Sequence, residues 1–203
     1  MTDEIPKRPY RMQQRAKLQE GTRLRITESA VELHGTLGPS RTSMSAVAAR
    51  AGVRRSTLYR HFPDEAVLFD ACTAHWLGAN PQPHLEGWAA IADPDARLRL
   101  ALGDLYAYYR RTEGMLAVVL RDERTMPIVA QMLAFYREYL ARAGEVLMAG
   151  RRERGKGRRR VRAAIGHGLA FGTWRSLTGE QGLDDVEGAG LICGMVAAAR
   201  AGR

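Results

Sequence analysis

The chain has 203 residues, of which 45% are hydrophobic and 26% are charged, and its formal net charge is +9 at pH 7. These proportions are those of ordinary globular proteins and exclude a chain that is disordered throughout. The longest uncharged apolar runs, near residues 163–174 and 188–199, are about 12 residues long, whereas a membrane-spanning helix needs about 20. The N-terminus also lacks the apolar core of a signal peptide, so we expect a cytoplasmic protein that does not enter the membrane.

The reactive side chains do not form a recognisable catalytic or metal-binding pattern. Cys72 and Cys193 are far apart, and each lies in an apolar helical context. Their spacing fits neither a metal site nor a disulfide framework, so we interpret both as buried thiols. No nucleophile and base pair or glycine-rich phosphate loop stands out, and the histidines are scattered at positions 34, 61, 75, 84 and 167. We therefore expect a protein that is not an enzyme and has no metal or cofactor.

Positive charge is concentrated in two basic islands. Residues 1–62 contain 12 Lys or Arg against 5 Asp or Glu, and residues 151–162 contain 8 against 1, so each island has a net charge of +7. The net charge of the rest of the chain is therefore −5, because the whole chain has a net charge of +9. An N-terminal island of this kind suits a polyanion such as DNA, although a merely solvated surface remains an alternative on charge alone.

The hydrophobic pattern predicts an all-α fold of about nine helices. Residues 1–14 are polar, contain Pro6 and Pro9, and are predicted to form a flexible basic arm. A first helix begins at Arg15 and ends at the GPS sequence, 38–40. A short helix capped by Thr42 or Ser43 then ends at Gly52. The remaining helices are predicted at about 53–61, 63–77, 93–113, 114–122, 127–149, 158–178 and 184–201.

The two short helices around Gly52 are typical of a helix-turn-helix. Ala48 and Ala51 would let the helices approach closely, and Leu58 and Phe62 would pack toward the first helix. No acidic residue occurs between Arg50 and Phe62, whereas a solvated helix more often mixes glutamate with lysine. This absence favours a DNA-reading surface, whose outward residues would be Arg54, Arg55, Ser56, Thr57, Tyr59, Arg60 and His61.

The sequence SMSAVAARAGVRRSTLYRHFPDEAVLF at 43–69 resembles the DNA-binding region of TetR-type (TetR/AcrR) transcriptional repressors. The likeness lies in a capped short helix, the spacing A-x-x-A-G-V, the segment T-L-Y-x-H-F-P and an acidic, apolar helix start. The close resemblance covers residues 22–69, and the remaining 134 residues agree only in length and helix pattern. It implies a helix-turn-helix DNA-binding domain at 15–62 and a helical ligand-binding and dimerisation domain at 63–203.

Carried over residue by residue, the resemblance implies a set of DNA contacts. Thr42 and Ser43 would cap the first short helix and could contact a phosphate. Arg54, Arg55 and Thr57 would face base edges or nearby phosphates. Tyr59 and His61 would contact the backbone, unless one side of either ring packs on the domain core. The implied contacts are therefore Thr42, Ser43, Arg54, Arg55, Ser56, Thr57, Tyr59, Arg60 and His61.

The sequence departs from the family pattern at two positions. The family usually has a lysine where the helix after Pro63 meets the phosphate backbone, and here that residue is Glu65. A carboxylate repels phosphate, so we expect this contact to be lost. The family's usual phenylalanine near the end of the first helix is His34, which we interpret as a packed core histidine. The cations that could compensate for Glu65 are Arg54, Arg55, Arg8, Arg11 and Arg15.

The middle helices are rich in large, adaptable side chains, and the resemblance implies a ligand cavity among them. Apolar pockets with few polar groups are the usual form of such a site. A hydrophobic or aromatic small molecule would bind there and release the DNA, although each aromatic could instead be plain core. Glu113 and Arg121 are further polar candidates. The implied ligand contacts are Trp76, Trp88, Tyr108, Tyr109, Met115, Met132, Phe135, Tyr136, His167, Phe171 and Trp174.

Small residues recur every four positions in the last two predicted helices. Because one helix-turn-helix reads only a half-site, specific binding needs a symmetric dimer on a palindromic operator of double-stranded DNA. We expect a homodimer interface of four helices, two from each subunit, with packing within one subunit as the alternative. The predicted interface residues are Ala164, Gly168, Gly172, Gly190, Gly194 and Ala198.

Two matters stay open in the sequence. The basic island at 151–162 is interpreted as a mobile, solvated loop, with an accessory contact to nucleic acid or an acidic partner as the alternative. The leading function is a ligand-responsive, dimeric transcriptional repressor. The alternative is a DNA-binding regulator without a small-molecule ligand, controlled by a protein partner or constitutive.

Overall fold

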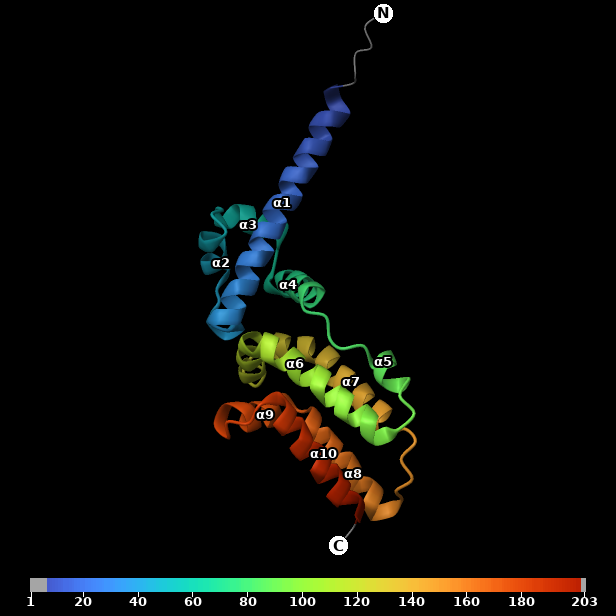
Figure 1. The fold of residues 1–203 in the computed structure, drawn as a ribbon. Coiled ribbons are helices and arrows are strands. Elements are labelled where there is room, and N and C mark those ends of the chain that lie inside the picture. The colour runs from blue at the N-terminus through green and yellow to red at the C-terminus, as the bar shows by residue number, and fades with distance from the viewer. Residues whose placement is uncertain (1–6, 202–203) are drawn as a thin grey trace, which may run out of the picture. The chain divides into compact units, whose positions relative to one another are not determined.

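The computed structural model describes residues 7–201, and its regular elements are helical (Figure 1), which confirms the all-α prediction. The chain forms two compact units. The first contains the described residues up to Ala79 together with Val118–Val129, and the second contains Asn80–Ala117 together with the described residues from Ala130 onward.

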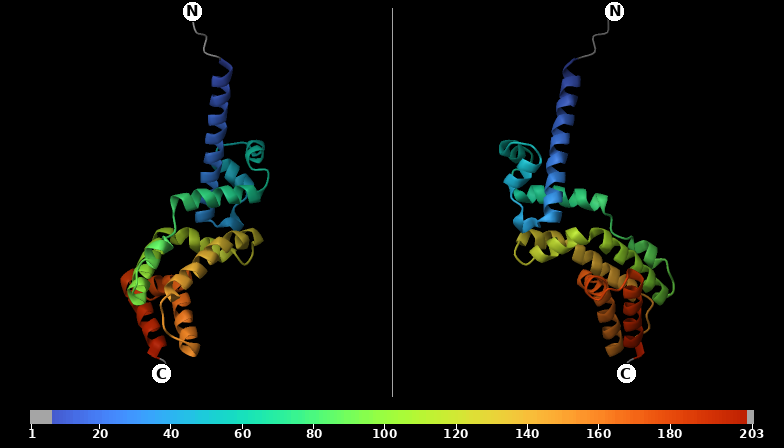
Figure 2. Two further views of the ribbon diagram at one scale, coloured as in Figure 1. Left: turned by 90° about the vertical axis from the view of Figure 1, so that its right-hand side faces the viewer. Right: turned by 60° about the vertical axis from the view of Figure 1, so that its left-hand side comes forward.

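The first unit is built around the C-terminal half of one long helix, α1 (Lys7–Thr36). Packed against it are η1 (Pro39–Arg41), α2 (Met44–Arg50), α3 (Arg55–His61) and α4 (Glu65–Ala79), while the N-terminal half of α1 stands clear of them (Figures 1 and 2). The core joins these helices through fully buried side chains, among them Ile26, Val47, Leu58 and Phe62. Burying such side chains contributes about 1.5–3 kcal/mol each.

The first helix begins eight residues earlier than the sequence pattern indicates. Residues 7–14, predicted as part of a flexible arm, are the first turns of α1, so the arm prediction is wrong for them. Pro9 lies in the first turn, where the missing N–H group of a proline has no helical partner to lose. Residues 1–6 of the predicted arm lie outside the described residues.

The first unit also extends beyond the predicted domain boundary at residue 62, because α4 packs on α1. The His34 and Phe69 rings stack with their centroids 4.7 Å apart, and the Cys72 Sγ lies 3.8 Å from the carbonyl oxygen of Thr27. Both His34 and Cys72 are buried, in agreement with their interpretation as core residues. Burial lowers the pKa of His34 to about 4, so the ring is neutral at pH 7.

The second unit contains longer helices and several differences from the predicted ones. The predicted helices at 93–113 and 114–122 are a single helix, since α6 continues through Gly114, and glycine within a helix costs only about 1 kcal/mol. A short helix at 85–89 was not predicted. The predicted helix at 158–178 is interrupted at Ala170, whose backbone is extended with φ −74° and ψ 132°. The elements after α4 are α5 (Leu85–Ala89), α6 (Pro94–Asp122), α7 (Pro127–Met148), α8 (Gly155–Leu169), α9 (Phe171–Arg175), η2 (Ser176–Glu180) and α10 (Asp185–Ala201).

Candidate nucleic-acid interface

The first short helix of the predicted motif, α2, is capped by Ser43. The Ser43 Oγ accepts a hydrogen bond from the backbone N–H of Ala46 at 3.2 Å, which satisfies one of the free N–H groups of the first helical turn. Thr42 instead belongs to the preceding turn, where its hydroxyl donates to the carbonyl oxygen of Gly38 at 2.9 Å. Of the two predicted caps, Ser43 is therefore the cap in the structure.

The turn between α2 and α3 depends on Gly52, which has φ +65°. This left-handed conformation is readily adopted by glycine and strained for residues with a Cβ atom. The chain then returns to α2 through a hydrogen bond of 3.0 Å from the N–H of Val53 to the carbonyl oxygen of Ala48. The buried Ala48 and Ala51 allow the two helices to approach closely, as predicted.

One side of α3 is fixed in the core and the other is open to solvent. Leu58 and the following Phe62 have no exposed surface, so they fix both the rotation of α3 and its distance from α1. Thr57 is half-buried beside them. The predicted DNA-binding residues that the structure leaves exposed here are Arg54, Arg55, Ser56, Tyr59 and Arg60.

Arg55 and Tyr59 form a pair on this exposed surface. They are four residues apart and therefore adjacent on one helix face. An Arg55 Nη2 donates to the Tyr59 hydroxyl at 3.4 Å, and the guanidinium carbon lies 5.8 Å from the centre of the ring. The two side chains present a planar cation and a phenol side by side, a combination that suits guanine edges and phosphates.

His61, the last residue of α3, is only partly exposed. The ring is half-buried, and its Nε2 is buried without a hydrogen-bond partner among the described residues. Burial, and then the nearby Arg60 and Arg23 charges, lower the pKa of His61. The partial burial of the ring supports the alternative that one side of it packs on the domain core, and the contact of His61 with the DNA backbone stays a prediction.

The start of α4 carries acids, as the sequence predicts. The Asp64 Oδ1 accepts the N–H of Val67 at 2.9 Å and caps the helix, and Glu65 follows as its first residue, exposed to solvent. Negative side chains stabilise a helix N-terminus, but they also repel a phosphate. The loss of the phosphate contact at this position remains a prediction, and the local charge supports it.

The residues predicted to bind a ligand are only partly brought together. In the second unit, the Tyr109 ring centroid lies 5.4 Å from that of Phe171 and 5.8 Å from that of Trp174. The Tyr109 hydroxyl donates to the carbonyl oxygen of Leu169 at 2.6 Å and lies 2.9 Å from the Tyr136 hydroxyl. These aromatic side chains pack against one another. We call Tyr109, Tyr136, Phe171 and Trp174 the aromatic cluster.

Of the other ligand candidates, Tyr108 also lies against this cluster, with its ring centroid 6.0 Å from that of Tyr109. Trp76 lies on α4 in the first unit, and 71% of the Phe135 surface is exposed. Trp88 is buried and donates its indole N–H to Asp104 at 2.8 Å. His167 is exposed, with its ring nitrogens 3.2 and 3.5 Å from the Thr173 hydroxyl. Tyr108 is buried, Met115 and Met132 are half-buried, Glu113 is exposed, and Arg121 binds Asp122 and the carbonyl oxygen of Leu37 within the first unit.

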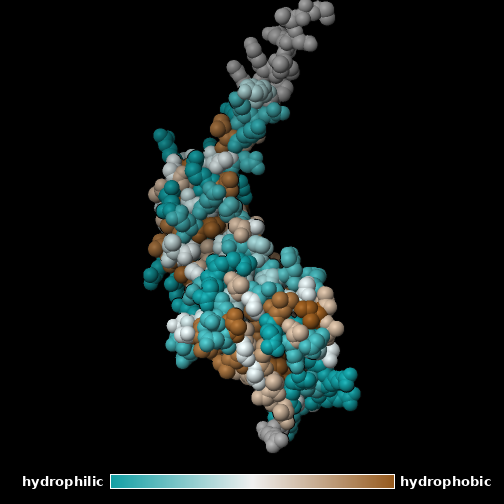
Figure 3. Space-filling view, in the orientation of Figure 1, coloured by the Kyte–Doolittle hydropathy of each residue, from teal (hydrophilic) through white to brown (hydrophobic). Residues whose placement is uncertain are grey.

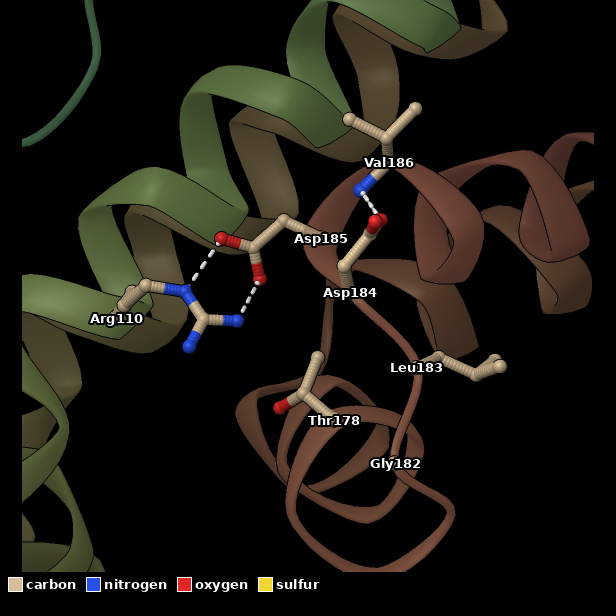
Figure 4. A pocket seen from close by; sticks show the side chains of 7 residues that line it. All are labelled: Arg110, Thr178, Gly182, Leu183, Asp184, Asp185 and Val186. Carbon is tan, nitrogen blue, oxygen red and sulfur yellow. Dashed lines mark hydrogen bonds and ion pairs between the residues drawn. The ribbon is translucent and has the colours of Figure 1, made fainter.

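A pocket of about 470 Å³ lies elsewhere in the second unit, between α6 and the start of α10 (Figure 4). Arg110 binds both carboxylate oxygens of Asp185 at 2.7 Å, and Asp185 also accepts the indole N–H of Trp174 at 2.9 Å. The Arg110 hydrogen bond is the main cause of the lowered pKa of Asp185. Arg110 and Asp185 are thus paired with each other, and none of the predicted ligand contacts lines this pocket.

The small residues predicted at a dimer interface divide into two groups. Gly168 faces α10 of its own chain, because a Cβ built there would lie 2.3 Å from the Ile192 Cγ2, and Ala164 is buried on the same helix. Gly172 is exposed but belongs to α9, so the predicted single-helix stripe does not exist. The exposed face of α10 carries Gly190, Leu191, Gly194, Met195 and Ala198.

The second basic island is largely helical. Residues 155–162 lie in α8, so the loop prediction is wrong for 155–157, whereas 158–162 agree with the helix predicted at 158–178 and 151–154 precede α8. Arg151 is buried and donates to Asp95 at 2.9 Å, to the carbonyl oxygen of Leu147 at 2.9 Å and to that of Pro94 at 2.9 Å. Arg152, Arg154, Lys156, Arg159 and Arg160 are exposed. Part of the island is thus structural and part is solvated.

Within the described residues, no group of three or more His, Cys, Asp or Glu side chains could hold a metal ion. No helix in this part of the chain is long and apolar enough to cross a membrane.

The comparisons with known proteins agree with this architecture. Residues 26–72 match the family model described as bacterial regulatory proteins, tetR family. No curated protein matches the chain. Among solved structures, a TetR-like transcriptional regulator from Rhodococcus sp. RHA1 superposes with a TM-score of 0.66 at 18% identity, covering 90% of this chain and 97% of that one.

Two further solved structures have the same fold. A Clostridium perfringens protein named as a fatty acid metabolism regulator gives a TM-score of 0.63 at 14% identity, covering 86% of this chain and 97% of that one. A TetR-family transcriptional regulator from Mesorhizobium loti gives 0.61 at 16% identity, covering 90% and 96%. The matched range 26–72 spans α2, α3 and the parts of α1 and α4 that pack with them.

Proposed function

We propose that this chain, which belongs to the tetR family of bacterial regulatory proteins and is a DNA-binding transcriptional regulator, is a repressor that binds a palindromic operator as a homodimer. The observation that carries the proposal is the exposed surface of α3, which holds Arg54, Arg55, Tyr59 and Arg60 and no acid. Its buried Leu58 and Phe62 hold that surface outward, so the basic side chains can enter a major groove without unfolding any core.

Dimerisation follows from what one recognition helix can read. A single α3 covers only a few base pairs, and two half-sites about 34–36 Å apart are needed for a specific site. The exposed Gly190, Leu191, Gly194 and Met195 of α10 support a close helix–helix contact, since they form an apolar face that no described residue covers. Gly168 is better explained by packing inside the subunit.

The control of DNA binding has two candidate forms. In the first, a hydrophobic or aromatic small molecule enters the second unit beside the aromatic cluster and favours a subunit arrangement that misfits the operator. In the second, the regulator responds to a protein partner or acts constitutively. The direct packing of Tyr109 with Phe171 and Trp174 favours this second form, because a ligand would have to displace at least one of these rings.

Selection of bound DNA from a random duplex pool tests the proposed function. The full chain should enrich an inverted repeat with half-site centres about 10 base pairs, or a multiple of one helical turn, apart. Enrichment of a single half-site would contradict binding as a dimer, and the absence of any enriched sequence would contradict the DNA-binding role. A screen of hydrophobic and aromatic compounds on the selected operator then separates the two forms of control: release of DNA requires the first form, and thermal stabilisation without release favours the second.

A further inference from the structure

Roughly the first four turns of α1 extend beyond the helices that pack on its C-terminal half (Figure 1). We call residues 7–21 of α1 the α1 extension. Among its residues whose side chains the structure describes, Tyr10 and residues 12–21 are all exposed, including Leu18 at 72% and Met12 at 69%. Figure 3 shows a mainly hydrophilic surface along this part of α1, interrupted by hydrophobic side chains. Isolated helices of this length are marginal in water, so a bound partner would stabilise the extension.

The charge of the extension points to an anionic partner. Its sequence contains Lys7, Arg8, Arg11, Arg15 and Lys17 against the single acid Glu20, a net charge of +4. The formal charge of the whole chain is +9, so a segment of 15 residues holds nearly half of it. The exposed Leu18 and Met12 do not form the unbroken apolar stripe that a helix partner of the coiled-coil type would require.

Helical register places part of this charge on the helix-turn-helix side of α1. Successive residues of an α-helix are rotated by about 100° around the helix axis. Viewed along this axis, position 15 therefore lies about 80° from Arg23 on one side and about 80° from Arg25 on the other. Arg23 donates to the carbonyl oxygen of His61 at 2.7 Å, and Arg25 donates to that of Ala51 at 3.0 Å. These two contacts mark the end of α3 and the end of α2, so position 15 projects between them. Positions 8 and 11 fall within about 60° of position 15 in the same register.

The start of α4 lacks a cation at the position where the family resemblance implies a phosphate contact. Asp64 and Glu65 at the start of α4 put two carboxylates where a cation would meet the backbone. The helix rises about 1.5 Å per residue, so the extension reaches about 22 Å beyond Arg23 at position 8. That length corresponds to roughly six base pairs at about 3.4 Å each.

We infer that the α1 extension is a second DNA-contacting surface, in which positions 8, 11 and 15 bind phosphates of the operator outside the base pairs that α3 reads. This inference rests on the proposed function. It assigns to the chain a footprint longer than its recognised half-sites and a stronger dependence of affinity on salt than α3 alone would give. The contacts carry no base specificity, because phosphates position a protein without reading sequence.

The test uses the full chain, the selected operator and two lengths of flanking duplex. The triple variant Arg8→Gln, Arg11→Gln, Arg15→Gln removes three positive charges from the α1 extension. The matched control, Arg99→Gln, Arg142→Gln, Arg159→Gln, removes three exposed arginines from the second unit. Dissociation constants are measured from 50 to 250 mM KCl on operators that carry 10 or 2 base pairs outside each half-site.

The wild type and the control variant should bind the long-flank operator at least tenfold more tightly than the short-flank operator at low salt. The triple variant should show no preference between the two. Its slope of log K against log [salt] should also be smaller by at least 2, since each phosphate contact contributes about 0.9. Circular dichroism should show the same unfolding midpoint for all three proteins.

Several outcomes would overturn the inference. If the wild type binds both operators equally and the triple variant keeps the wild-type slope within 0.5, the extension does not touch DNA. If the triple variant instead changes the oligomeric state in sedimentation velocity, the surface pairs with a second copy. Both results require that the wild type binds its operator; a wild type that selects no DNA contradicts the proposed function itself, so the two failures are distinguishable.

Discussion

Arg23 on α1 donates a hydrogen bond of 2.7 Å to the carbonyl oxygen of His61, the last residue of α3. The same guanidinium lies 4.2 Å from the centre of the Phe62 ring, so one side chain satisfies a carbonyl at the helix end and covers the residue that anchors it. The recognition helix is thus tied to α1 by a polar contact as well as by the buried Leu58 and Phe62.

We expect Arg23→Ala to weaken operator binding while it weakens the fold only modestly. Loss of one charge-assisted hydrogen bond at an exposed site should lower the free energy of unfolding by about 1 kcal/mol, measured by urea denaturation. Operator affinity should fall at least fivefold, because the end of α3 loses its fixed position. Arg23→Lys, which keeps the charge, is the control: full recovery of affinity by lysine would show that charge alone matters and would contradict the positioning role.

His34 should make the stability of the protein depend on pH. Its folded pKa is about 4 and its ordinary pKa is 6.5, because burial against Phe69 disfavours the charged ring. Above pH 6.5 both states are neutral, and as the pH falls from 6.5 to 4 the unfolded state takes up the proton first. Stability should therefore fall by up to about 3 kcal/mol over this window and level off below pH 4.

The measurement is the difference in unfolding free energy between the wild type and His34→Phe from pH 7.5 to 4. The variant should lose much less stability over this range, since a phenylalanine can stack on Phe69 without titrating. His84→Gln, at an exposed position, serves as the control and should keep the wild-type dependence of stability on pH. Parallel curves for the wild type and His34→Phe would show that His34 does not titrate as described.

Arg97 should be among the most destabilising residues to replace in the second unit. The side chain is buried, and its guanidinium donates to the carbonyl oxygens of Ile91, Val146 and Ala149 at 2.6 to 2.9 Å. Arg97→Met removes the charged donor from these buried carbonyl oxygens and should lower the free energy of unfolding by about 3 kcal/mol. Arg99→Met, at an exposed position two residues along the chain, should change the free energy of unfolding by less than about 0.5 kcal/mol. Equal effects of the two variants would contradict the stabilising role of the Arg97 hydrogen bonds.

Substitutions at Gly168 and Gly194 should distinguish packing inside the subunit from the proposed dimer contact. Gly168→Ala should destabilise the fold by about 1–3 kcal/mol, because its Cβ would collide with Ile192. Gly194→Glu should leave the fold stable and shift the dimer toward monomer in sedimentation equilibrium, with Gly103→Glu, an exposed glycine of α6, as the control. A Gly194→Glu protein that remains as dimeric as the control would place the interface elsewhere.

The first unit could be predicted from sequence because its signals are local. Ser43 as a cap, Gly52 in the turn and the acids after Pro63 each determine the backbone within a few residues. The second unit is specified by long-range contacts, which no local pattern reports. The spacing of small residues indicates that another helix can approach Gly168 closely, but it does not show whether that helix is α10 with Ile192 or belongs to a second subunit. The sequence around Arg97 likewise gives no sign that this arginine is buried. Phe135 is of a residue type that usually lies in a protein core, yet its side chain is exposed.

Discrimination between the selected operator and a scrambled duplex is the most direct test that α3 reads DNA through Arg55. An arginine bound to a guanine edge contributes about 1–3 kcal/mol of discrimination. The affinity ratio of Arg55→Ala should therefore fall at least tenfold below that of the wild type, while Arg99→Ala keeps the wild-type ratio. A ratio for Arg55→Ala within twofold of the wild type would contradict the account.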